Sequence, residues 1–97
     1  MIVSLCLEAQ RELIEGALFY SQHADVQLGM SFIAEFERSL ALLNEHPELG
    51  AVWRVGTRRF PLRRFPYSVI YRMAGDELRV IALAHQRRRP RYWSGRK

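Results

Sequence analysis

The sequence is poor in the residues that give small domains covalent or metal-based support. Cys6 is the only cysteine among 97 residues, so the chain can form no internal disulfide and no thiolate zinc site. Three scattered histidines do not form a ligand set either, and we expect no metal and no cofactor. This sparing use of cysteine is typical of proteins from a reducing compartment.

Long apolar runs and targeting signals are also missing. No stretch of about 18 apolar residues occurs, so we expect no membrane-spanning helix and no membrane partner. The N-terminal stretch MIVSLCLEAQRELIEGA lacks a basic flank and turns polar at Glu8, unlike a signal peptide. We therefore expect a cytoplasmic protein. The length fits one domain, residues 1–97, and a hydrophobic fraction of 48% is ordinary for a globular core.

The charges are divided unevenly along the chain. Residues 1–50 carry two arginines against eight acidic residues, whereas residues 51–97 carry thirteen basic residues against two acidic ones. The formal net charge of +5 conceals this division. Such an asymmetry indicates an acidic or polyanionic partner, although the two halves could also neutralise each other across the fold.

The first half of the chain predicts a short strand and two helices. Residues 2–6 (IVSLC) form an apolar run suited to a strand. From residue 7 to Tyr20 apolar side chains recur every three or four positions, as in an amphipathic helix. Asp25 is a suitable N-cap for a second helix, which Pro47 must end. These elements form a helical hairpin.

The second half predicts strands. Residues 58–65 (RRFPLRRF) alternate apolar and basic side chains, and residues 67–73 and 78–85 are rich in β-branched and aromatic residues. A Gly75-Asp76 turn joins the last two into a β-hairpin. The order β-α-α-β-β-β predicts an α+β fold, with the helical hairpin packed on one face of a small, mainly antiparallel sheet.

The last predicted β-hairpin is apolar on both of its faces. A period of two places Ile70, Ile81 and Leu83 on the face opposite to Val69 and Val80. Two helices can bury only one face of this sheet. We therefore expect the other face to meet a neighbouring protein.

Three segments carry a family resemblance: LGMSFIAEFERSLALLNEHPELG (residues 28–50), RRFPLRRFPYSVIYRM (58–73) and VIALAHQRRRPRYW (80–93). With the order of the elements, they resemble the RelE/ParE superfamily, the toxins of type II toxin–antitoxin modules, often called plasmid stabilisation proteins. The resemblance covers nearly the whole chain and implies the same fold. It also implies a cognate antitoxin, which wraps an extended, partly helical segment around the toxin in a heteromeric complex.

The resemblance implies one of two activities. In the ParE-like branch, the toxin arrests growth by binding and inhibiting DNA gyrase, without chemistry of its own. In the RelE-like branch, the toxin enters the ribosome and cleaves mRNA as an endoribonuclease. An inactive relative that keeps antitoxin binding and a nucleic-acid-binding module without an antitoxin are further alternatives. Whether the chain is an enzyme is open at this point.

Ribonuclease chemistry needs a base, an acid and a cation beside the phosphate. Pro61 and Ser68 depart from the RelE-like pattern, because they stand where those ribonucleases carry a basic residue and an arginine. The departures favour the ParE-like branch. A period of two nevertheless places Arg59 and Arg63 on one strand face. The candidate catalytic set is Arg59, Arg63, His85, Arg87 and Tyr92.

A protein that acts by contact would instead use its basic and aromatic surface. The stretch AHQRRRPRYW, residues 84–93, places four arginines, a histidine and two aromatic residues directly after the last predicted strand. The arginines could also only protect a sheet edge, and the tryptophan could only hold the tail on the sheet. The candidate residues for contact with a target or an antitoxin are Arg58, Arg59, Arg63, Arg64, Arg87, Arg88, Arg89, Arg91 and Trp93.

Overall fold

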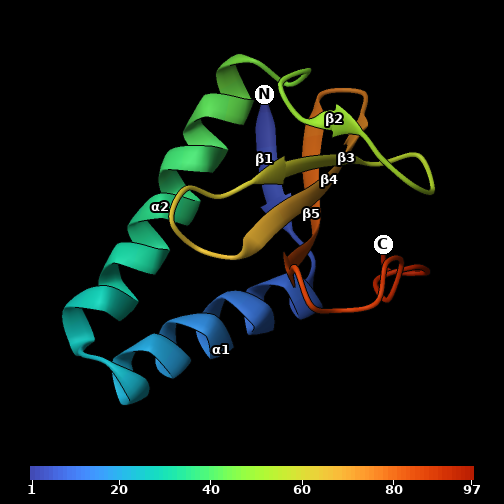
Figure 1. Cartoon of the computed structure of the whole chain (residues 1–97). Helices are drawn as coiled ribbons and strands as arrows, with labels where there is room; N and C mark the ends of the chain where they lie inside the picture. The colour runs from blue at the N-terminus through green and yellow to red at the C-terminus, as the bar shows by residue number, and fades with distance from the viewer.

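The computed structural model describes residues 1–97 and shows two helices packed against one five-stranded sheet (Figure 1). The strand order is β1-β5-β4-β3-β2; β1 is parallel to β5, and the other pairs are antiparallel. The predicted α+β fold is confirmed, with the two-residue strand β2 as an addition. The elements are β1 (Ile2–Leu5), α1 (Leu7–His23), α2 (Val26–Glu45), β2 (Ala51–Val52), β3 (Arg58–Pro61), β4 (Tyr67–Ala74) and β5 (Glu77–His85).

The two helices form the hairpin that the sequence predicts. Asp25 caps α2, since its carboxylate accepts a hydrogen bond from the backbone nitrogen of Leu28 at 2.7 Å. A Cβ atom at Gly29 would lie 2.7 Å from the carbonyl oxygen of Ala17, so only glycine allows α2 to approach α1 this closely. Neither helix combines the length and apolar character needed to cross a membrane.

A β-bulge in β5 decides which side chains face the helices. The register shifts between Ile70 and Tyr71 of β4, and Ile81 on β5 has no partner. The prediction that Leu83 shares a face with Ile70 and Ile81 is therefore wrong. Beyond the bulge, Leu83 joins the helix-facing core together with Val80. A strict period of two has no place for an inserted residue.

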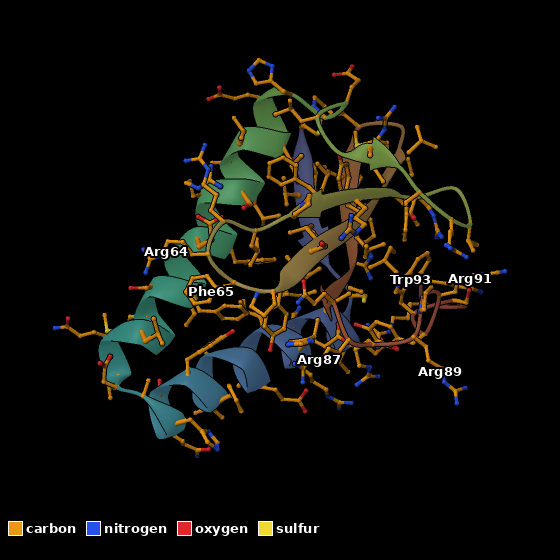
Figure 2. All side chains as sticks on the ribbon, in the orientation of Figure 1. Arg64, Phe65, Arg87, Arg89, Arg91 and Trp93 are labelled. Atoms are coloured by element: carbon orange, nitrogen blue, oxygen red, sulfur yellow. The ribbon has the colours of Figure 1, made fainter.

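The C-terminal segment after β5 covers the sheet face that the helices leave free. Trp93 is only 2% exposed and packs with Ile70, Ile81 and Ala82. Figure 2 shows Trp93 beside this segment and far from α2. The expectation that this face needs a neighbouring protein is therefore wrong for its centre, because the chain's own indole buries the apolar side chains there.

Candidate functional site

One carboxylate attaches the C-terminal segment to α1. Glu12 accepts hydrogen bonds from the Tyr92 hydroxyl at 2.6 Å and from the two terminal nitrogens of Arg96 at 2.8 and 3.2 Å. It also accepts the backbone N–H of Leu83 at 3.1 Å. Strand β1 pairs with β5 only as far as Val80, so Glu12 supplies the acceptor that β1 no longer provides. The segment is therefore held in one place on the sheet.

This attachment determines the chemistry of Tyr92. Burial and the hydrogen bond to Glu12 raise the pKa of Tyr92 far above the ordinary value of a phenol. Burial acts to lower the pKa of Arg96, but the hydrogen bonds to Glu12 and the attraction of its negative charge together outweigh burial and raise this pKa. At neutral pH the phenol therefore keeps its proton, and its hydroxyl donates a hydrogen bond to Glu12 within the protein.

A pocket of about 270 Å³ opens on the same side of the sheet as Trp93. Its floor includes Ser68 and Ala84, which are cross-strand partners on β4 and β5. Because both side chains are small, they leave space for the pocket above this part of the sheet. Trp53 and Arg59 line the pocket from the region of β2 and β3, and the C-terminal segment lines it opposite. The pocket is therefore built from three separate parts of the chain.

Arginine side chains lie against the aromatic rings of this pocket. The guanidinium carbon of Arg59 is 5.3 Å from the ring centroid of Trp53, and that of Arg88 is 4.2 Å from that of Tyr92. Both distances are within the range of cation–π attraction, about 6 Å. Arg89 and His85 also line the pocket, and no acidic residue does. The site is cationic and aromatic.

Only part of the candidate catalytic set gathers in this pocket. Arg59, His85 and Tyr92 line it, but Arg63 and Arg87 do not. The prediction that Arg59 and Arg63 share a strand face is wrong, because β3 ends before Arg63 is reached. The backbone nitrogen of Arg63 instead donates to the Glu35 carboxylate at 2.7 Å, which holds this loop against α2.

One of the two ring nitrogens of His85 is already engaged in a hydrogen bond. Its Nδ1 accepts a hydrogen bond from the backbone N–H of Arg87 at 3.0 Å, and the ring meets Tyr67 edge-on. In the neutral imidazole the proton is therefore on Nε2, which then donates and cannot accept a proton. No group of three His, Cys, Asp or Glu side chains is placed to hold a metal ion.

Of the other basic candidates, Arg88 and Arg89 line the pocket, and the rest lie outside it: Arg58, Arg64, Arg87 and Arg91. Arg58 donates to the backbone oxygen of Gly50 at 2.7 Å and so fixes the loop after α2. Figure 2 shows Arg64 beside α2, and Arg89 and Arg91 around the C-terminal segment. Arg87, Arg88, Arg89 and Arg91 are all exposed, whereas Trp93 is buried and lines the pocket wall.

The sequence patterns did not predict Glu12 or Trp53 as site residues. Glu12 looks like the other acidic residues on the polar face of α1, and nothing local distinguishes it. Trp53 follows a two-residue strand and reads as loop packing. Its one signal is its position in the sequence, between the acidic half of the chain that forms the two helices and the basic strand β3.

Comparison with known proteins places this architecture among toxins. The family model described as "ParE toxin of type II toxin-antitoxin system, parDE" matches residues 3–90. A solved structure, "Chromosomal ParDE TA system from P. aeruginosa", has a TM-score of 0.78 and 18% sequence identity, over 88% of this chain and 95% of that chain. This likeness shows a shared fold. No curated protein sequence matches the chain.

Proposed function

The chain belongs to the ParE toxin family of type II toxin–antitoxin systems, and on that premise we propose that it arrests growth by binding and inhibiting DNA gyrase. The observation that carries the proposal is the state of the candidate acid and base. The Tyr92 hydroxyl is bonded to Glu12, and Nδ1 of His85 is bonded to the backbone of Arg87. A contact surface, unlike a ribonuclease site, requires neither group to be free.

The exposed arginines after β5 support action by contact. Arg87, Arg88, Arg89 and Arg91 are exposed within five residues of chain, and none of them forms an ion pair. A dense group of unpaired cations raises the rate of encounter with an acidic protein surface or with the DNA that gyrase holds. The basic C-terminal segment is therefore the part of the surface that we assign to the target.

The cellular lesion tests this proposal. After induction of the protein, we expect trapped gyrase–DNA cleavage complexes and an SOS response. With purified gyrase, we expect the protein alone to increase the yield of cleaved DNA. Codon-positioned cuts in mRNA, without cleaved DNA, would instead support the ribosome-dependent endoribonuclease and overturn the gyrase proposal. The uninduced culture is the control.

A toxin of this family implies an antitoxin partner, and we propose that part of it covers the outer face of the helical hairpin. Ile14 and Leu18 lie one turn apart on α1 and are 58% and 52% exposed. Met30 and Ile33 are exposed on α2. Apolar side chains exposed along both helices favour a partner that buries them. An acidic, apolar-studded antitoxin segment would also match the basic half of the chain.

Leu18→Asp is expected to weaken antitoxin binding at least about tenfold, because it removes an apolar contact and places a charge in the interface. Val52→Asp, which replaces an exposed apolar side chain of β2 outside the helical hairpin, is the matched control. Titration at two ionic strengths should also show weaker binding at the higher one. If co-expressed antitoxin still rescues growth equally well and titration shows unchanged affinity for the Leu18 variant, this face is not the antitoxin site.

A further inference from the structure

The pocket between β3 and the C-terminal segment combines features that packing alone does not require. Three aromatic side chains line it, Trp53, Tyr92 and Trp93, together with Arg59 and Arg88. We propose that it binds one unpaired nucleotide of a single-stranded nucleic acid, a ligand that is distinct from gyrase itself. The base packs on the Trp53 side, and the phosphate lies on the side of the exposed arginines.

The Trp53 side of the pocket brings an indole ring and arginine side chains together. The Trp53 ring is half-buried, and the Arg59 guanidinium lies 5.3 Å from its centroid. Bases stack on both aromatic rings and guanidinium planes, and such stacking tolerates any sequence because every base has a π-face. The pair therefore offers an apolar, cation-bearing platform that suits a base better than an aliphatic or acidic side chain.

The opposite side of the pocket provides the charge that a phosphate requires. Arg88 and Arg89 are exposed and line the pocket, and neither has an acidic partner. The Arg88 guanidinium is held over the Tyr92 ring at 4.2 Å, and Tyr92 is itself held by Glu12. One of the two cations is therefore positioned before a ligand arrives, which favours binding because less ordering is needed.

The size of the pocket selects a single nucleotide over a duplex. Its volume of about 270 Å³ is near the lower end of ligand sites, roughly 300 Å³. In a duplex the bases are paired and stacked on one another, so none can enter a pocket without being extruded. The floor adds the Ser68 hydroxyl, which can donate to or accept from a base edge. Single-stranded DNA and RNA share this chemistry.

Fluorescence anisotropy of the purified chain with labelled oligothymidylate and oligouridylate tests the proposal. We expect salt-sensitive binding that Trp53→Ala weakens about 5- to 100-fold and that Trp53→Phe largely preserves. Arg88→Ala should lower the slope of log affinity against log salt by about 0.7, the value for one lost phosphate contact on a single strand. A preference for one of the two oligonucleotides shows whether the ligand is DNA or RNA, and either preference supports the proposal that the pocket binds a nucleotide.

The matched control is Arg11→Ala, which removes one exposed arginine from α1, outside the pocket. Trp53 and Trp93 both line the pocket, so bound oligonucleotide should quench the indole emission, and Trp53→Phe should remove part of that quenching. Absence of binding, equal losses in Arg11→Ala and Trp53→Ala, or equal competition by polyglutamate would overturn the proposal. None of these measurements includes gyrase. Nucleotide binding by the pocket can therefore be disproved while the gyrase proposal stands, and the gyrase proposal can be disproved while nucleotide binding stands.

Discussion

Arg87→Glu combined with Arg88→Glu is expected to abolish growth arrest while leaving the protein folded. Both side chains are exposed and neither forms an ion pair, so their reversal removes no internal salt bridge. In a contact with an acidic protein surface or with DNA, each reversal replaces attraction with repulsion. A combined penalty of about 3 kcal/mol would weaken the contact about a hundredfold. Colony counts after induction and thermal melting of the purified variant measure the two effects separately.

His85→Ala and Tyr92→Phe distinguish contact from catalysis. Loss of a general acid or base costs a ribonuclease about 10²- to 10⁴-fold in rate, whereas a binding surface needs no proton transfer. We therefore expect both variants to remain toxic. Arg11→Glu reverses an exposed charge on α1 and controls for net charge. If the double arginine variant stays toxic and His85→Ala does not, action by contact is wrong and cleavage is the better account.

The elements that the sequence predicts well are those with local signals. Asp25 caps α2 and Pro47 follows its end, and both effects act within one helical turn. The turn at Gly75 is equally local. The bulge at Ile81 is not, because an inserted residue appears only when β5 is paired with β4. The two-residue strand β2 likewise exists only because Ala51 and Val52 pair with β3.

The candidate site was predictable to the same extent. The arginines after β5 are adjacent in the sequence, so their common surface follows from their spacing alone. Tyr92 is different, because its pKa and its availability depend on Glu12, 80 residues away. The sequence suggests Trp93 as a contact residue, but the structure buries it, because its indole packs on the apolar sheet face that the helices leave uncovered. Long-range contacts determine which side chains of a basic stretch remain free.

Glu12→Gln is expected to destabilise the protein by about 3 kcal/mol, because four N–H and O–H donors converge on this one carboxylate. A glutamine offers one acceptor oxygen, and its amide nitrogen would face donors. The side chains of Glu12 and Arg96 are each only 15% exposed, so water can replace few of the lost bonds. In a domain of this size the melting temperature should fall by more than about 10 °C. Scanning calorimetry measures this shift.

Limited trypsin digestion separates detachment of the C-terminal segment from unfolding of the whole domain. If Glu12 mainly attaches the segment, Glu12→Gln should expose the bonds after Arg87, Arg88 and Arg91 to cleavage at temperatures where the helices and sheet remain folded. Glu15→Gln, an exposed carboxylate on the same helix, should change neither melting nor cleavage. Tyr92→Phe removes one of the four donors and should cost only about 1 kcal/mol. Equal stability of the Glu12 and Glu15 variants would mean that burial of Trp93, rather than the carboxylate, holds the segment on the sheet.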